Sequence, residues 1–165
     1  GLLFGAAQAH HDAAQEFGFQ FGIGGAWLPD GAVLLLVGVD LLHAAVRHVD
    51  FGLAVGAARV GFAQTYRVIT VLKGAGTIIA APSGETRVNT TGNPGMAKGG
   101  SGDVLAGITG ALCAQNMQPF EAAYSAVCIH GAAGDLCAEA LSQHGMLPTD
   151  LIEKLPQVFL QIEGK

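Results

Sequence analysis

A glycine-rich stretch that leads directly into an apolar helix is the part of this sequence best suited to chemistry. Five glycines lie from Gly92 to Gly102, and Asp103 follows just before apolar residues begin to recur at helical spacing. Such a chain can curl so that its amides point inward, and the first turn of a helix presents unpaired N–H groups and a partial positive charge. The junction between loop and helix is therefore a predicted anion-binding site.

Asp103 is a carboxylate at the mouth of this predicted site, where binding an anion alone would not require one. A phosphate cradle with a carboxylate beside it is typical of phosphoryl transfer to a hydroxyl group, in which positioning and electrostatics do most of the work. The alternative is structural, because an acidic residue at the start of a helix stabilises it by about 0.5–2 kcal/mol. The residues themselves leave both roles open.

Two lysines are candidates for contacts with phosphate. Lys73 ends an apolar strand and precedes Gly74 and Gly76, and ligands of open α/β sheets bind beyond the carboxyl ends of strands. Lys98 lies inside the glycine-rich stretch. For each, a solvent-exposed lysine without a ligand is the alternative. No Gly-Lys-Ser/Thr sequence of a Walker loop and no GxGxxG sequence of a dinucleotide fold is present, so any nucleotide is held in another way.

Other polar residues fit a structural role more readily. His130 precedes Gly131 in a predicted helix, which is typical of a buried, hydrogen-bonded histidine beside a close helix contact. Three residues before the loop helix are predicted to bind the turn backbone, with a metal-water shell or a ribose as alternatives: Asn89, Thr90 and Asn93. Two further acidic residues are interpreted as surface or core residues: Asp135 and Glu139.

The elements that must position these residues change in character along the chain. Residues 1–58 contain no lysine, and within them residues 33–39 resemble a strand and residues 40–49 a short helix. From about Arg59 onward, the pattern predicts strands at residues 68–72, 77–81 and 85–89, with turns at 73–76 and 82–84. Helices are predicted at residues 60–66 and 119–140. A third helix follows the glycine-rich stretch, with the apolar face Val104, Leu105, Ile108, Ala111 and Leu112. A last helix begins at Thr149 or Asp150, with the apolar face Leu151, Leu155, Val158 and Ile162. Strands followed by helices predict a layered α/β domain.

The composition excludes several classes of partner. Half of the residues are apolar and 13% are charged, which is typical of a globular chain. The net charge of −5 argues against nucleic acid, and the apolar run 31–39 is too short to span a membrane. No signal peptide is recognised, and Cys113, Cys128 and Cys137 are expected to be small buried side chains in a reducing compartment, so the prediction is a cytoplasmic chain. The apolar content also predicts a homo-oligomer.

Three segments together resemble a known enzyme family. They are the sequence VLKGAGT at residues 71–77, the glycine-rich stretch at residues 92–107, and HGAAGD at residues 130–135. They are similar to the ADP/ATP-dependent NAD(P)H-hydrate dehydratases, metabolite-repair enzymes of the ribokinase-like superfamily. The similarity covers about residues 59–160, and its central stretch is long and specific. It implies a ribokinase-like layered α/β fold with a central sheet flanked by helices.

The resemblance implies a nucleotide-dependent lyase reaction. The hydroxyl of hydrated NADH or NADPH is phosphorylated at the expense of ADP or ATP, and the phosphate is then eliminated to restore the nicotinamide ring. By matching position, Asp103 is the catalytic residue that faces the substrate and activates this hydroxyl. Asn93 is a further candidate for binding the substrate. The nucleotide lies against Lys73, Gly74, Ala75, Gly76, Thr77 and Gly102. The anion hole consists of the amides of Gly99, Gly100 and Ser101, with that of Gly102. Mg²⁺ neutralises the phosphates, and no side chain is assigned to the metal.

The chain departs from the family at two places. Lys98 stands where the family usually has a small hydroxyl residue, which adds a positive charge near the phosphates. Residues 1–58 match nothing in the family, including its Thr-Pro-His-x-Gly-Glu type of segment, so we expect a single, incomplete ribokinase-like domain with the nucleotide loop and helices in residues 59–165. Two other functions stay open: a small-molecule alcohol kinase of the hydroxymethylpyrimidine or thiazole type, and a catalytically inactive nucleotide-binding fragment.

Overall fold

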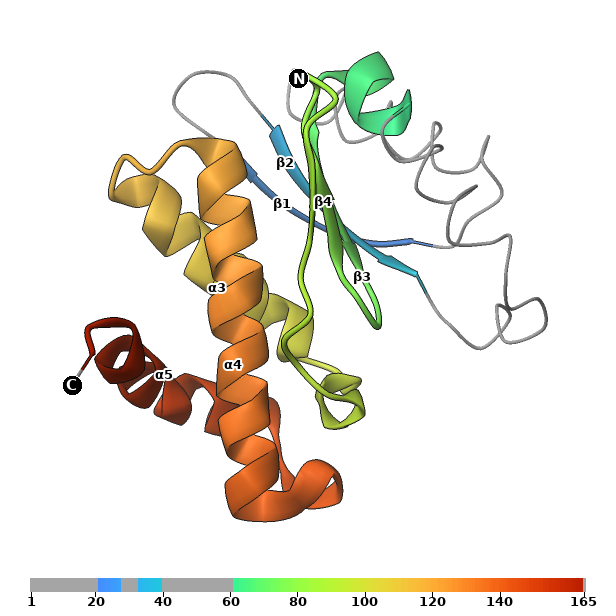
Figure 1. Ribbon diagram of the computed structural model, residues 1–165. Helices are drawn as coiled ribbons and strands as arrows, with labels where there is room; N and C mark the ends of the chain where they lie inside the picture. The colour runs from blue at the N-terminus through green and yellow to red at the C-terminus, as the bar shows by residue number, and fades with distance from the viewer. Residues whose placement is uncertain (1–20, 28–32, 40–60, 165) are drawn as a thin grey trace.

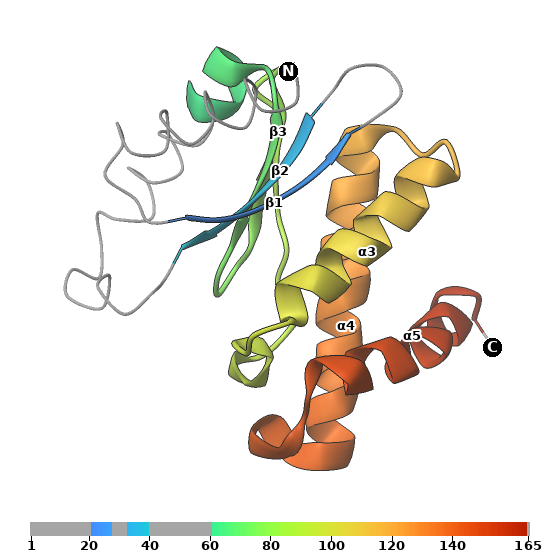
Figure 2. The ribbon, with the colours of Figure 1, turned by 180° about the vertical axis from the view of Figure 1, so that it is seen from behind.

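The computed structural model describes residues 21–27, 33–39 and 61–164 (Figure 1). Their strands form one sheet, and helices α3 (Ser101–Ala114) and α4 (Pro119–Gly145) lie together on one of its faces. The view from behind shows the same layering, with α3 next to β1 (Phe21–Trp27) and α4 behind it (Figure 2). This is a layered α/β arrangement, as the sequence predicts.

The sheet has five strands in the order β1-β2-β3-β4-β5. After β1, the strands are β2 (Val33–Val39), β3 (Ile69–Lys73), β4 (Ile78–Ala80) and β5 (Thr86–Val88). The pairing of β2 with β3 is parallel, and the other three pairs are antiparallel. Because β2 and β3 run in the same direction, their carboxyl ends meet at one edge of the sheet, where Gly38 pairs with Lys73.

The third strand is the apolar centre of the sheet. Its residues Ile69 to Leu72 are all buried, which explains why three of the four are apolar and the strand shows no alternation of apolar and polar residues; the exception is Thr70. The turn to β4 is closed at Thr77, whose hydroxyl accepts a hydrogen bond from the Gly74 amide at 3.4 Å and donates to the Gly74 carbonyl at 3.2 Å. Gly76 has a φ of 73°, which explains the glycine there.

The helical layer is built from α3, α4 and α5 (Pro148–Ile162), with a short 3₁₀ helix, η2 (Pro94–Met96), in the loop before α3. Proline stands in the first turn of α4 and of α5, where its missing N–H has no helical partner to lose. Near the end of α4, Ser142 has a φ of 65° and interrupts the helical backbone. None of the helices in the described ranges is both long and apolar enough to cross a membrane.

A single apolar cluster joins the sheet to the helices. It includes Val71 and Ile79 from the sheet, Leu105 from α3 and Leu151 from α5, all nearly inaccessible to solvent. The middle of α4 contributes mostly small side chains, such as Ala123 and Ala133, which let this long helix pack closely against its neighbours. The core therefore fixes the end of β3 and the beginning of α3 relative to each other.

The predicted elements after residue 60 are confirmed, with differences at their ends. Residues 61–66 are helical. Helix α4 continues to Gly145, beyond the predicted end. Helix α5 begins at Pro148, before the predicted start, and Asp150 lies in its first turn, where its carboxylate accepts a hydrogen bond from the Leu147 amide at 2.6 Å. The apolar faces of two helices are narrower than predicted, since Ala111 is exposed and Ile162 is 66% exposed.

The earlier part of the chain holds one strand that the sequence analysis missed. Strand β2 is confirmed at Val33–Val39, whereas β1 was not predicted. Its sequence, FGIGGAW, is interrupted by glycines and has neither a β-branched run nor an alternating pattern. The helix predicted at residues 40–49 lies outside the described residues. Of the cysteines, Cys137 is buried as expected, but Cys113 and Cys128 are half-buried.

Candidate functional site

The glycine-rich loop is attached to the middle of α4 through Asp135. The Asp135 carboxylate accepts hydrogen bonds from the Gly92 amide at 2.9 Å and from Asn93 Nδ2 at 3.0 Å. Asn93 Nδ2 also donates to the Gly134 carbonyl at 2.9 Å, and Asn93 Oδ1 accepts from the Gly95 amide at 3.0 Å, which caps η2. The Asn93 side chain therefore shapes the loop, and its predicted contact with the substrate stays a prediction.

The sequence analysis interpreted Asp135 as a residue without a specific role, and this interpretation was wrong. Its carboxylate is half-buried and holds two donors of the loop. A signal for it was present in the sequence HGAAGD, because Asp135 stands four residues after Gly131 and therefore on the same face of α4. An acidic residue on a helix face made of small residues is placed to receive another segment of the chain.

Two glycines of α4 allow the loop to approach the helix backbone. A Cβ on Gly131 would lie 2.1 Å from Thr91 Oγ1 and 2.8 Å from the Thr91 carbonyl carbon. A Cβ on Gly134 would lie 2.2 Å from Met96 Sδ. The close contact predicted at Gly131 is confirmed, although its partner is the loop and not another helix.

Asn89, just before the loop, holds the backbone of the turn. It is 4% exposed, its Nδ2 donates to the Thr91 carbonyl at 2.9 Å, and its Oδ1 accepts from the Thr91 hydroxyl at 2.8 Å. This is the backbone role that the sequence favoured for Asn89. The sequence also placed Lys98 near the phosphates or in solvent, but Lys98 Nζ instead donates to the carbonyl of His144 at 2.9 Å and to that of Met146. It thus binds the carboxyl end of α4.

The end of β3 and the start of α3 meet, although they are far apart in the sequence. A Cβ built on Gly102 would lie 2.7 Å from Lys73 Nζ, so the lysine ammonium rests directly against the backbone of the first turn of α3. Gly102 is immediately followed by Asp103, which is exposed in the same turn. Lys73, the first residue of the predicted nucleotide segment, therefore lies beside the helix turn that contains the predicted catalytic carboxylate.

The backbone before α3 makes a sharp turn at Gly100, which has a φ of 94° and precedes the first helical residue. The Ser101 amide donates to the Lys98 carbonyl at 3.2 Å, and the Asp103 amide donates to the Gly100 carbonyl at 3.1 Å. The turn thus brings Gly99, Gly100 and Ser101 to the positive end of α3. Their service as an anion hole stays a prediction.

A buried histidine lies directly beneath this turn. His130 of α4 is 8% exposed, and its Nε2 lies 3.2 Å from Ser101 Oγ, which is also buried. Burial lowers the pKa of His130 to about 4; a hydrogen bond to the Ser101 backbone opposes this shift, and the positive charge of Lys73 adds to it. The imidazole is therefore neutral near pH 7. The predicted buried, hydrogen-bonded histidine is confirmed.

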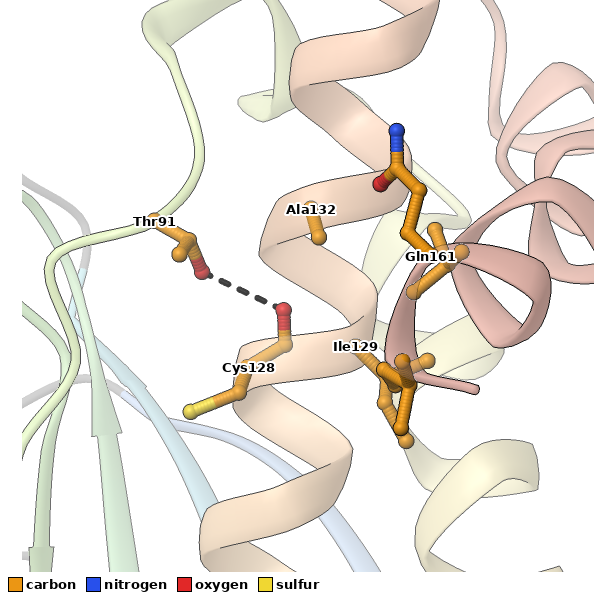
Figure 3. A pocket seen from close by; sticks show the side chains of 7 residues that line it. Thr91, Cys128, Ile129, Ala132 and Gln161 are labelled. Atoms are coloured by element: carbon orange, nitrogen blue, oxygen red, sulfur yellow. Dashed lines mark hydrogen bonds between the residues drawn. The ribbon is translucent and has the colours of Figure 1, made fainter. Parts of the chain in front are cut away.

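A separate groove lies between α4 and α5 (Figure 3). Its volume is about 290 Å³ and its walls are mostly apolar, with the bond from the Thr91 hydroxyl to the Cys128 carbonyl, 3.2 Å long, at one side. The residues that line it are Thr91, Cys128, Ile129, Ala132, Val158, Gln161 and Ile162. None of the predicted site residues is among them.

Comparison with known proteins decides which family has this arrangement. The profile of the carbohydrate-kinase-type family described as NAD(P)H-hydrate dehydratase matches residues 53–157. This chain belongs to the NAD(P)H-hydrate dehydratase family. The resemblance drawn from VLKGAGT, the glycine-rich stretch and HGAAGD is thereby confirmed.

Individual members of the family support this assignment. The bifunctional NAD(P)H-hydrate repair enzyme Nnr of Moorella thermoacetica is 45% identical over 102 residues, which are 62% of this chain and 19% of that enzyme. The ADP-dependent (S)-NAD(P)H-hydrate dehydratase of Bacillus subtilis is 41% identical over 103 residues, which are 62% of this chain and 37% of that enzyme. The chain therefore spans well under half the length of these curated relatives.

A solved structure from the family has the same fold. The ADP/ATP-dependent NAD(P)H-hydrate dehydratase from Bacillus subtilis, co-crystallised with ATP and Mg²⁺ and soaked with CoA, superposes with a TM-score of 0.67 at 30% identity. The match covers 78% of this chain and 48% of that chain. The predicted ribokinase-like α/β fold is confirmed for the part of the present chain that superposes on that structure.

Proposed function

We propose that this chain carries out nucleotide-dependent dehydration of hydrated NADH or NADPH, by phosphorylation of the hydrate hydroxyl and elimination of phosphate. The observation that carries the proposal is the contact of the Lys73 ammonium with Gly102, beside the exposed Asp103. The chain's family membership supplies the substrate class. The Bacillus subtilis relative is named as an ADP-dependent dehydratase, and the Bacillus subtilis crystal structure was grown with ATP and Mg²⁺, so either nucleotide fits the proposal.

In the proposed reaction, the nucleotide phosphates lie against the turn from Lys73 to Thr77 and approach Gly102, which has no side chain to prevent it. The Lys73 ammonium and the amides of Gly99, Gly100 and Gly102 balance the negative charge that develops on the transferring phosphoryl group, whereas the Ser101 amide already donates to the Lys98 carbonyl. Asp103 accepts the proton of the hydrate hydroxyl while the oxygen of that hydroxyl attacks the terminal phosphorus of the nucleotide, and the shortened nucleotide leaves. Asn93 contacts the substrate beside it. The C–O bond to the phosphate then breaks, the adjacent ring carbon loses a proton, and the electron pair of that C–H bond forms the ring double bond.

The residue set around this site also bears on the expected Mg²⁺. No group of three or more His, Cys, Asp or Glu side chains is placed to hold a metal ion among the residues that the structure describes. Mg²⁺ commonly binds through substrate phosphates with one or two carboxylates and retained water. We therefore propose that the nucleotide phosphates would hold Mg²⁺, which would neutralise their charge.

The test is the recovery of NADH absorbance from the hydrate in the presence of ADP or ATP. We expect recovery with the unaltered chain and a loss of about 10²–10⁴-fold in rate for Asp103→Asn, which keeps the shape of the side chain and removes its basicity. The matched control is Glu139→Gln, which removes an exposed carboxylate from α4 instead of α3 and should leave the rate unchanged. Equal rates for Asp103→Asn and the unaltered chain would contradict the proposed role.

The same assay with labelled nucleotide separates the other functions. Free labelled phosphate released in step with NADH recovery supports the dehydratase. Label found on a stable alcohol product would identify a kinase instead. Nucleotide binding without turnover would identify an inactive nucleotide-binding fragment.

Two further proposals concern the setting of this activity. Several large apolar side chains of α5 are exposed, among them Ile152 at 52% and Ile162 at 66%. We propose that the protein self-associates as a homo-oligomer, which light scattering over a concentration series would detect. A cytoplasmic location, with reduced cysteines and access to NADH, fits the proposed substrate and is proposed with it.

A further inference from the structure

We propose that His130 is a positioning residue for the nucleotide site, an inference that rests on the function proposed above. From beneath the first turn of α3, it donates a hydrogen bond from Nε2 to Ser101 Oγ and so directs the Ser101 hydroxyl proton toward a bound phosphate. The starting observation is the 3.2 Å separation of Nε2 and Oγ in a buried environment. Ser101 thereby becomes a phosphate donor through its side chain, while its amide donates to the Lys98 carbonyl.

The positions of the two residues in their helices assign each a different task. His130 is 8% exposed and lies in the middle of α4, away from the helix start that is predicted to bind the anion. Ser101 is 6% exposed, but it is the first residue of α3 and adjoins Gly102, against which the Lys73 ammonium rests. An anion that reaches Lys73 and Gly102 therefore also reaches the neighbourhood of Ser101.

The charges around the pair keep the imidazole neutral. Lys73, from β3, is the charged group that acts on His130, and its positive charge adds to the lowering of the pKa of the ring by burial. A second positive charge on the imidazole would be costly in a buried position, which is why the ring stays neutral. A neutral imidazole has one N–H and one bare nitrogen. With the N–H on Nε2, Ser101 Oγ accepts from His130 and keeps its own proton for an acceptor in the site.

The arrangement has a chemical advantage over a serine alone. A free hydroxyl rotates, and its proton is as ready to point into the protein as toward a ligand. A donor on Nε2 occupies the inward lone pair of Oγ and leaves the outward direction for the proton. The hydrogen bond to a phosphate oxygen then forms with less loss of rotational freedom.

The test measures the affinity of the 165-residue chain for ADP with Mg²⁺ by calorimetry. We expect Ser101→Ala and His130→Leu each to weaken binding about tenfold, the effect of one hydrogen bond to a charged group. Because both changes remove the same interaction, the double variant should be no weaker than either single variant by more than about twofold. His130→Gln supplies an amide N–H at a similar reach and should restore affinity to within about threefold of the unaltered chain.

A matched control is available in the same helix. Thr109 has a fully buried hydroxyl that donates to the Leu105 carbonyl of its own helix at 2.8 Å, away from the site. Thr109→Val removes a buried hydroxyl as Ser101→Ala does, and it should leave ADP affinity unchanged. A ¹⁵N spectrum of the imidazole should also show the proton on Nε2, a signature that a purely structural histidine need not have.

The outcomes separate this inference from the proposed function. If His130→Leu binds ADP as tightly as the unaltered chain, or if the two single effects multiply in the double variant, the inference is wrong even when the hydrate is dehydrated. If binding depends on the pair but no hydrate is converted, the dehydratase function fails and the inference stands. An unaltered chain that does not bind ADP overturns the inference. Should His130→Leu fail to fold, Ser101→Ala and His130→Gln carry the same comparison.

Discussion

Gly131→Ala tests how closely the glycine-rich loop must approach α4. The added methyl group would lie 2.1 Å from Thr91 Oγ1 and 2.8 Å from the Thr91 carbonyl carbon. The hydroxyl can rotate away, but the carbonyl carbon is backbone and moves only with the loop. Any relief therefore displaces the segment that leads into the predicted site.

The magnitude follows from three contributions. Forced contacts in a packed region cost about 1–3 kcal/mol. Displacing the Thr91 hydroxyl weakens its bonds to Asn89 Oδ1 at 2.8 Å and to the Cys128 carbonyl at 3.2 Å, which adds about 1 kcal/mol. Replacing glycine by alanine inside a helix returns about 1 kcal/mol. The expected net loss in the free energy of unfolding is about 1–3 kcal/mol.

The assay is urea denaturation followed by circular dichroism, with Gly107→Ala as the control. Gly107 is an exposed residue of α3, and a Cβ there would meet nothing within 4 Å. The control should therefore gain about 1 kcal/mol of stability from the same chemical change. A Gly131→Ala variant as stable as the unaltered chain, or one that gains as much as the control, would refute the reasoning that backbone contact requires this glycine.

Three other predictions concern the residues around the site. The pKa of His130 is 6.5 in the unfolded chain and about 4 in the folded protein, so the folded state loses stability when the imidazole is protonated. The free energy of unfolding should be highest above pH 6.5 and should decline by roughly 3 kcal/mol as the pH falls to 4. Thermal melts of His130→Gln over the same pH range should lack this decline. Gly102→Ala should change stability by less than about 1 kcal/mol, since Lys73 is flexible, yet weaken ADP binding measured by calorimetry about tenfold or more. Asp135→Ala removes the acceptor of two loop donors and should lower the free energy of unfolding in urea by about 2 kcal/mol; an unchanged urea midpoint would show that the loop holds without it.

The parts of the fold that were predictable have a local cause. The buried run of β3, the glycine turn that follows it and the apolar periodicity of α3 each depend on residues close together in the chain. Strand β1 was not predictable in this way, because its glycines give it no strand pattern of its own and its register comes from pairing with β2. The width of an apolar helix face is likewise a tertiary matter, which is why the exposure of Ile162 was missed.

The sequence by itself determined that a glycine loop, a helix start and a carboxylate stand together at Asp103, because neighbouring residues create that chemistry wherever the chain is placed. It also determined the family, since three specific segments recur in the right order. The tertiary structure decided which distant residues serve the loop. It placed Lys73 on Gly102, Asp135 under Gly92, and His130 behind Ser101. The physical reason is that these contacts join elements through packing of the core, and residue periodicity along one element contains no information about its neighbours.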